Sequence, residues 1–335
     1  MIIDDALHAI DRRQQRTRGV RFVAAVIKKF GDDQGGQLAA LLSYYGFVSL
    51  FPLLLVFVTV LGFVLQGHPA DQQKILNGAV GQFPLIHDQL TLHSIKGSTI
   101  GLIVGIVGAL LAGMGATGAA QMAFNRIWAV PFKHRPNFIF SRLRGLGLLA
   151  VLGTISIVST VAAGFVGTSD HSAPAVTAGI AVSLIANLAL FMTAFKVLTA
   201  AELHWRTLLP GVVTAALLWE ILHVAGGYYV DHELKRTSPL YGTFALVLGL
   251  LAWLYLGAQM TMISAEVNVV KARELWPRSF FSDPLTDADR RALTHSAETE
   301  ERIEEENVDV SFDEQADGPP AAPAGAPQSP SGRPR

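Results

Sequence analysis

Six long apolar runs restrict this chain to folds that satisfy every backbone hydrogen bond inside lipid. The runs cover roughly residues 38–65, 98–122, 145–168, 174–195, 207–230 and 239–265. A bilayer core is crossed by about 20 apolar helical residues, and each run reaches that length. Lipid offers the backbone no partners, so the runs must be helices or strands of a closed barrel. Barrel strands alternate between apolar and polar residues, which these runs do not. The sequence therefore predicts an all-α, polytopic membrane protein with six transmembrane helices.

The composition agrees with this class and excludes several kinds of chemistry. Half of the residues are hydrophobic and 16% are charged, whereas soluble domains carry about 25% charged residues. A large soluble core built from the same helices is the disfavoured alternative. The chain has no cysteine, which excludes disulfides, thiolate metal sites and cysteine nucleophiles.

The distribution of Lys and Arg predicts the orientation. Basic residues near span ends are retained on the cytoplasmic side of a membrane. With the N-terminus inside, the inner segments hold seventeen Lys and Arg and the outer loops hold four. We therefore expect both termini to be cytoplasmic. The first apolar run is too long, and starts too late, to indicate a cleavable signal peptide.

Residues 1–37 form the first predicted region, a cytosolic arm. Val23, Val26, Ile27 and Phe30 share one helical face, and basic residues occupy the remainder. This pattern is typical of an amphipathic helix lying in the interface beside anionic lipid headgroups. An ordinary cytosolic cap helix is the alternative.

Residues 38–277 form the second region, the six-helix membrane domain. Its second run carries small residues at four-residue spacing on two faces, which allow close helix contact in lipid. We therefore expect that helix to lie centrally in the bundle. Pro52 in the first run predicts a kink.

Residues 278–335 form the third region. It carries seven more acidic than basic residues, and its end is mostly Pro, Ala, Gly and Ser. Such a segment cannot bury enough apolar surface to offset its ordering entropy. We therefore predict an acidic, then Pro/Ala/Gly-rich, disordered tail that offers a possible site for a protein partner.

Three sets of residues together resemble a known family. They are Leu38 to Leu55 around Ser49-Leu50-Phe51-Pro52; Asn125-Arg126-Ile127-Trp128; and a late set with Leu209-Pro210-Gly211, Ser238-Pro239-Leu240-Tyr241-Gly242, Trp253 and Ala265-Glu266-Val267-Asn268. In order and spacing they resemble the YihY/BrkB family of bacterial inner-membrane proteins over about residues 20–275. The resemblance implies six spans, a plasma-membrane location and a suspected role in transport or in the envelope. It does not supply a substrate.

Some members of that family bear the label ribonuclease BN, and the residues do not support such chemistry. Metal-dependent hydrolysis of RNA needs clustered His and carboxylate ligands. The sequence has no His-x-His-x-Asp motif, and its ten histidines are scattered. The basic inner loops follow from orientation alone. We therefore expect no enzyme activity, no catalytic residue, no metal or other cofactor and no nucleic-acid partner.

Glu220 is the one charged residue in the six runs, and it marks a candidate polar cavity. An intramembrane carboxylate is unfavourable and normally faces a cavity or a partner. His223 lies three residues on, and the first run adds Tyr44, Tyr45, Ser49 and Pro52. Glu-x-x-His also occurs in di-iron bundles, but those sites need two such motifs and two further carboxylates. A proton-linked or cation-linked site is one reading. A structural hydrogen bond, for example to Asn187, is the alternative.

A second candidate site lies at the inner ends of two spans. Asn125 and Arg126 follow the second run, and Glu266 and Asn268 follow the sixth. An Arg126–Glu266 ion pair would satisfy both charges and close the inner mouth as a structural latch.

The leading functional hypothesis is a membrane protein that moves, or helps to move, a lipid-related or small amphipathic solute. The sequence has no nucleotide-binding motif, so a gradient or a partner would drive transport. A non-transporting envelope scaffold is the rival. Membrane lipids are the expected partners under both hypotheses, and the sequence assigns no oligomeric state.

Overall fold

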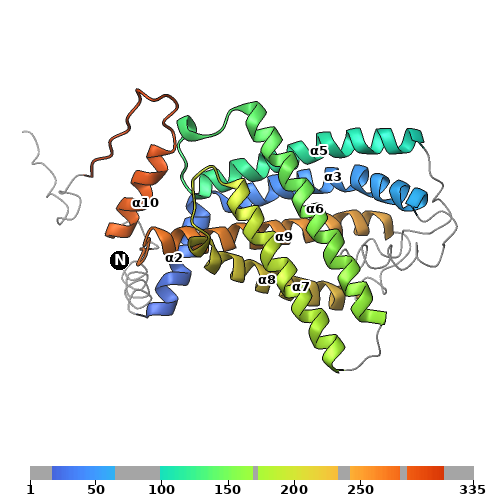
Figure 1. Ribbon diagram of the computed structural model, residues 1–335. Helices are drawn as coiled ribbons and strands as arrows, with labels where there is room; N and C mark the ends of the chain where they lie inside the picture. The colour runs from blue at the N-terminus through green and yellow to red at the C-terminus, as the bar shows by residue number, and fades with distance from the viewer. Residues whose placement is uncertain (1–16, 65–98, 169–172, 233–241, 280–284, 313–335) are drawn as a thin grey trace, which may run out of the picture.

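The computed structural model describes residues 17–64, 99–168, 173–232, 242–279 and 285–312, and the regular structure in these ranges is entirely helical. The elements are α2 (Arg18–Asp32), α3 (Gly35–Val64), α5 (Thr99–Ile127), the 3-10 helix η3 (Phe132–His134), α6 (Phe138–Thr168), α7 (Ala173–Leu198), α8 (Trp205–His232), α9 (Gly242–Ala272) and α10 (Asp287–Glu298) (Figure 1). The predicted all-α fold is confirmed.

The long helices coincide with the six apolar runs. Five of them contain stretches long and apolar enough to cross a membrane: Gly35–Val56, Ile103–Ile127, Phe138–Ile155, Trp205–Gly226 and Val247–Ala272. In α7 an apolar stretch covers Leu184–Leu198 among the residues whose side chains are described. A multi-pass membrane protein is therefore confirmed. The count of six spans and the side on which the termini lie stay predictions.

Helices α5 and α9 both lie among several other helices of the bundle. Helix α5 packs against α3, α6, α7 and α9, and α9 packs against α8, α3, α2 and α5, while α6 and α7 cross the other helices obliquely (Figure 1). Helix α5 exposes a row of large apolar side chains, including Val104, Val107 and Leu111. The four neighbours of α5 agree with the position expected of the second run. Its small residues serve close contacts with two helices: a methyl group added at Gly108 would lie 3.2 Å from Cβ of Pro52 on α3, and one added at Gly113 would lie 2.6 Å from Cδ1 of Leu149 on α6.

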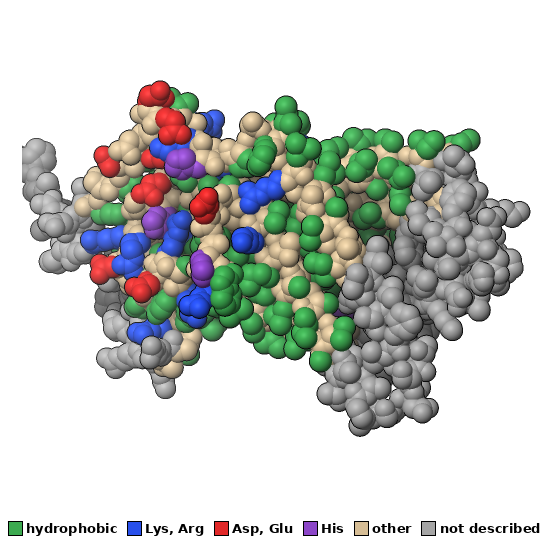
Figure 2. Space-filling view, in the orientation of Figure 1, with side chains coloured by type: hydrophobic (Ala, Val, Ile, Leu, Met, Phe, Trp, Pro, Cys, Tyr) green, Lys and Arg blue, Asp and Glu red, His purple; other side chains and the backbone are tan. Residues whose placement is uncertain are grey.

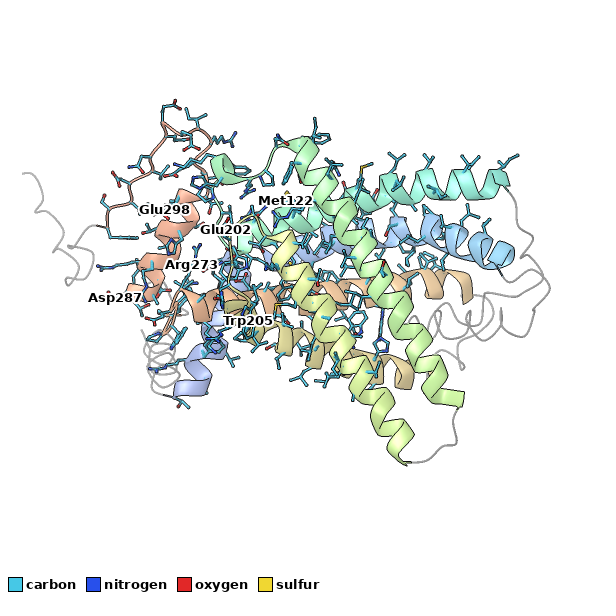
Figure 3. The ribbon with its side chains drawn as sticks, viewed as in Figure 1. Met122, Glu202, Trp205, Arg273, Asp287 and Glu298 are labelled. Carbon is cyan, nitrogen blue, oxygen red and sulfur yellow. The ribbon has the colours of Figure 1, made fainter. Side chains whose placement is uncertain are left out.

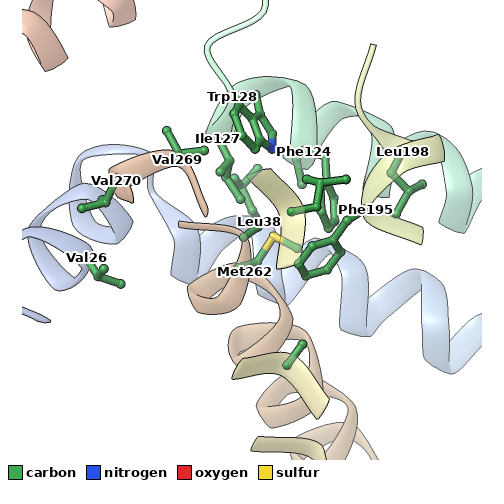
Figure 4. Close-up of a cluster of buried hydrophobic side chains, with 14 of the residues drawn as sticks. Val26, Leu38, Phe124, Ile127, Trp128, Phe195, Leu198, Met262, Val269 and Val270 are labelled. Carbon is green, nitrogen blue, oxygen red and sulfur yellow. The ribbon is translucent and has the colours of Figure 1, made fainter. Parts of the chain in front are cut away.

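The buried apolar core is concentrated toward one end of the bundle. Phe124 and Ile127 of α5, Phe195 of α7 and Met262 of α9 are almost fully buried there (Figure 4). The rings of Phe124 and Phe195 lie 5.1 Å apart, centroid to centroid. Aromatic pairs at this separation stabilise a core beyond the area they bury. This end is therefore the tightly packed part of the described structure.

Charged side chains gather at the same end (Figure 2). We call it the charged end and define it as α2, α10, the adjoining ends of α3, α5 and α9, and the segments 128–137 and 199–204. Lys29 Nζ lies 3.1 Å from the carbonyl oxygen of Ile127, and Lys133 lies 2.9 Å from Glu301. Segments that the charge distribution assigns to one side of the membrane are thus together in space.

Helix α2 packs on the body of the protein through part of its apolar surface. Ala25 and Val26 are buried against the core, whereas Val23 and Ile27 are 56% and 57% exposed. The predicted apolar face is therefore divided between the protein and the outside. Contact of Val23 and Ile27 with lipid stays a prediction.

The first part of the tail is folded, which corrects the prediction of disorder from residue 278. Helix α10 begins with a capping box, in which Thr286 accepts from the backbone of Asp289 and the Asp289 side chain accepts from the backbone of Thr286. Ala288, Asp289 and Ala292 are buried. The prediction weighed apolar burial alone, whereas capping and ion pairs order this segment. Residues 313–335 lie outside the described residues.

Candidate functional site

Glu220 lies on α8 and joins that helix to α7. The side-chain amide of Asn187 donates a hydrogen bond of 2.9 Å to Oε1 of Glu220. The carboxyl group is partly exposed, at the border between the buried face of α8 and its exposed residues Leu217 and Ile221. This geometry is the structural hydrogen bond that the sequence left open as an alternative. It also leaves one carboxyl oxygen available to another group.

His223 follows on the same side of α8, between two indole rings. Its ring centroid lies 5.3 Å from that of Trp219 and 6.2 Å from that of Trp253. Its Nε2 atom is buried and makes no hydrogen bond to the described residues. A methyl group at Gly226 would collide with Trp253, so this glycine lets α8 approach α9 closely beside His223.

The structure does not bring the α3 residues of the candidate cavity to Glu220. Tyr44 is 58% exposed, and a methyl group at Gly115 of α5 would contact the ring of Tyr45. Ser49 donates to the carbonyl oxygen of Gly46 in its own helix, at 2.8 Å, and Pro52 faces α5. These side chains therefore point to α5 or outward, while Glu220 points to α7.

Pro210, Gly211 and Asn268 form a polar contact between α8 and α9. Pro210 has no N–H group and lies inside α8. The N–H of Gly211 donates 2.6 Å to the side-chain oxygen of Asn268 on α9. A methyl group at Gly211 would collide with that side chain and with the carbonyl oxygen of Ser264. A side chain of α9 thus accepts from a backbone N–H of α8, which binds the two helices together.

Asn125 makes a similar connection at the end of α5. Its side-chain oxygen accepts a hydrogen bond of 2.7 Å from the N–H of Ala200, just after α7. Asn125 is buried, so this bond satisfies polar groups that water does not reach. Asn125 and Asn268 therefore each bind two parts of the bundle together through a backbone N–H. That they close an inner mouth stays a prediction.

Glu266 pairs with Lys29 and not with Arg126, which corrects the predicted ion pair. Glu266 is fully buried on α9, and Nζ of Lys29 lies 3.5 Å from its Oε2. The same ammonium group pairs with Asp33, which caps the C-terminal end of α2. Arg126 is exposed. The prediction placed α2 in the lipid interface, and this left Arg126 as the nearest available cation.

Asp289 organises a second ionic cluster, between α10 and the rest of the charged end. Its carboxylate accepts from Lys28 at 2.9 Å and from Arg278 at 2.8 Å. Burial alone raises the pKa of Asp289, but hydrogen bonds from Ser279, Lys28, Thr286 and Arg278 outweigh it and lower the pKa from 3.8 to about 2. The carboxylate is therefore ionised at neutral pH.

Sequence reasoning missed Lys29, Asp33 and Asp289. Local signals existed for all three, because Lys29 and Asp33 have the i,i+4 spacing of a helical ion pair and Thr286-x-x-Asp289 has the spacing of a capping box. Their partners on α9 and α2 are distant in sequence, and no local pattern indicates them.

The arrangement is chemically suited to holding helices together and to binding polar groups. Among the described ranges, no three His, Asp or Glu side chains are grouped so that they could hold a metal ion. The polar groups either close the charged end or, at Glu220 and His223, interrupt the apolar part of the bundle.

The chain is similar to a known protein family and to several bacterial proteins. A family model described as virulence factor BrkB matches residues 26–279. The inner membrane protein YhjD of Escherichia coli (strain K12) is 27% identical over 293 residues, which cover 78% of this chain and 85% of that protein. The UPF0761 membrane protein Smlt0865 of Stenotrophomonas maltophilia (strain K279a) is 24% identical, covering 77% of this chain and 62% of that protein.

A third relative bears on the question of enzyme activity. YfkH of Bacillus subtilis (strain 168) is 25% identical, covers 74% of this chain and 94% of its own length, and has a provisional ribonuclease-like name. The other names describe membrane proteins, so together they support no enzyme activity for this chain. No solved structure matches the chain.

Proposed function

Because the chain belongs to the virulence factor BrkB family of membrane proteins, we propose that it moves, or helps to move, a lipid-related or small amphipathic solute across the membrane. The observation that carries this proposal is the partly exposed Glu220–Asn187 pair, which lies within the apolar part of the bundle. A polar group at such a position costs free energy and typically marks a solute or proton pathway.

The surroundings of Glu220 suit a molecule with a polar head and an apolar body. Leu217, Ile221 and Val224 form an exposed apolar row on α8 beside the carboxyl group. An amphipathic solute could place its apolar part along this row and its polar part against Glu220. Both contacts would then be available within one helix face.

His223 supplies a second titratable group close to the first. Its Nε2 is buried and makes no hydrogen bond to the described residues, so a solute or water molecule that reached it would find a polar atom without a partner there. Glu220 and His223 would together couple solute movement to protons or cations.

The test uses the purified protein in lipid vesicles that contain a fluorescent phospholipid. Addition of a membrane-impermeant quencher measures how fast the lipid moves between the two leaflets. We expect the wild-type protein to raise this rate above that of protein-free vesicles. Equal rates with and without protein would contradict transport of lipid-like solutes.

Substitutions at Glu220 then separate the coupling role from a structural role. Glu220→Gln retains size and hydrogen bonding but not the titratable charge, so it should fold and lose most of the rate, while Glu220→Asp retains part of it. Thr214→Val is the matched control, because Thr214 lies on the same helix and its hydroxyl donates to the carbonyl oxygen of Pro210 in that helix. Full rates in both Glu220→Gln and Glu220→Leu would overturn the coupling role.

A non-transporting envelope scaffold is the second candidate, and the packing of the charged end favours it. Phe124, Ile127, Phe195 and Met262 form an apolar core there with almost no exposure, and Tyr44 is directed away from Glu220. A scaffold would give the lipid-movement rate of protein-free vesicles in every variant.

A further inference from the structure

A cavity of about 360 Å³ lies at the charged end, where α10 covers the ends of α2, α5 and α9. Its lining includes three arginines from three different segments: Arg126 of α5, Arg135 after η3 and Arg273 at the end of α9. Figure 3 labels Met122, Arg273 and Glu298 at the end of the molecule where these helices meet. The cavity is remote from Glu220 and takes no part in the proposed function.

The carboxylates of the lining already have cationic partners. Asp32 lies 2.8 Å from Arg278, and Asp33 pairs with Lys29. Glu300 lies 3.8 Å from Arg302. The acidic side chains are therefore engaged by cations other than the three arginines.

The arginines, in contrast, have no carboxylate within ion-pair distance in the described part of the chain. Arg135 donates to the carbonyl oxygen of Val130, at 3.0 Å from Nε and 2.9 Å from one terminal nitrogen. Arg273 donates to the carbonyl oxygen of Trp128. Arg126 makes no hydrogen bond or ion pair with a described residue, and its guanidinium group is exposed. Several N–H donors are thus left for another acceptor.

The positive charges also oppose each other. Burial lowers the pKa of the Arg135 guanidinium, Glu300 raises it, and the charge of Arg126 lowers it. Burial likewise lowers the pKa of Arg273. Arginine nevertheless stays protonated in proteins. An anion in the cavity would relieve the repulsion and use the free donors.

We propose that this cavity binds a phosphate-bearing anion through Arg126, Arg135 and Arg273. Guanidinium groups match the geometry of phosphate oxygens and bind them in pairs of parallel hydrogen bonds. The phosphate could belong to an anionic lipid headgroup or to a soluble molecule. Exposed apolar side chains in the lining, Met122, Phe132 and Leu293, favour the lipid.

The experiment measures thermal unfolding of the full chain with two kinds of probe. In one arm, sodium phosphate is titrated into detergent-solubilised protein, with sodium chloride at matched ionic strength as the reference. In the other, nanodiscs of phosphatidylglycerol are compared with nanodiscs of phosphatidylcholine that have the same acyl chains. A ligand that binds the folded state raises the unfolding temperature. Stabilisation by phosphatidylglycerol alone identifies a lipid headgroup, and stabilisation by phosphate identifies a soluble ligand.

Arg126→Gln tests the assignment, because this exposed residue contributes no bond to the fold. We expect it to weaken binding about tenfold, which is the size of one charge-assisted hydrogen bond. Arg206→Gln is the matched control: it removes an exposed arginine at the start of α8, outside the cavity, and should bind like the wild type. Equal weakening in both variants, or no response of the wild-type protein to either probe, would overturn the proposal. The responses of the wild-type protein to the two probes test the proposal even if a variant fails to fold.

Discussion

The charged end accommodates buried polar groups in a different way from the apolar half of the bundle, which is the part of the long helices away from that end and includes Glu220. At the charged end, the ammonium group of Lys29 lies beside the carboxyl groups of both Asp33 and Glu266, and Asn268 bonds to the backbone of a second helix. In the apolar half, Glu220 has one bond, to Asn187, and stays partly exposed.

This difference distinguishes polar groups that stabilise the fold from polar groups that are available to a solute. A buried charge is tolerated when several partners surround it, and removing one partner leaves the others in an unfavourable state. A group with one partner contributes little to stability and keeps a site free for a solute. The four predictions below test this contrast, beginning with the largest effect.

Lys29→Met should destabilise the protein by about 3–5 kcal/mol, because Asp33 and Glu266 then lose their shared cation. The free energy of unfolding in detergent, followed by tryptophan fluorescence, measures the loss. Lys271→Met is the control, since Lys271 is exposed at the same end, and it should cost less than about 1 kcal/mol. Similar losses for both substitutions would show that the ionic cluster is unimportant.

Truncation after residue 284 should cost about 3 kcal/mol, because it removes Asp289 from Lys28 and Arg278. Truncation after Phe312 retains α10 and should leave the unfolding temperature unchanged. The comparison of these two lengths tests whether α10 belongs to the charged end. Equal unfolding temperatures would support the original prediction that the whole tail is disordered.

Low pH should release α10. The pKa of Asp289 is about 2 in the folded protein and 3.8 ordinarily, so its stabilising effect of roughly 2 kcal/mol is complete above pH 4 and is lost as the pH falls toward 2. The chain has no cysteine, so Ser296→Cys gives a unique site for a spin label on α10. Label mobility should rise between pH 4 and pH 2, and Asp289→Asn should abolish this pH dependence. A transition above pH 5 would assign the release to another group.

Glu220→Leu should have the smallest effect, about 1 kcal/mol, which is the scale of hydrogen bonds between helices in bilayers. Asn187→Leu removes the other partner and should cost the same amount. The double substitution should cost less than the sum of the two. A loss as large as that of Lys29→Met would mean that Glu220 is structural, and the contrast between the two regions would fail.

The sequence predicted those features that depend on local patterns. Apolar runs longer than a bilayer core predicted the long helices, and the positions of Asn125, Glu266 and Asn268 near span ends predicted polar contacts there. The partners were not predictable, because Lys28 and Asp289 are 261 positions apart. The tail was misjudged because only its small apolar surface was weighed. In the structure Asp289 and Glu301 each face a specific cation.

The distance along the chain between α2 and its ionic partners has a consequence for biosynthesis. Lys28 and Lys29 leave the ribosome first, whereas Glu266 and Asp289 follow about 240–260 residues later. At 5–20 residues per second this interval is roughly 12–52 s. The lysines lie before the first apolar run, so water can solvate them during the wait. The charged end can close only after the last membrane helix is made, so its closure reports that all the described helices have been synthesised.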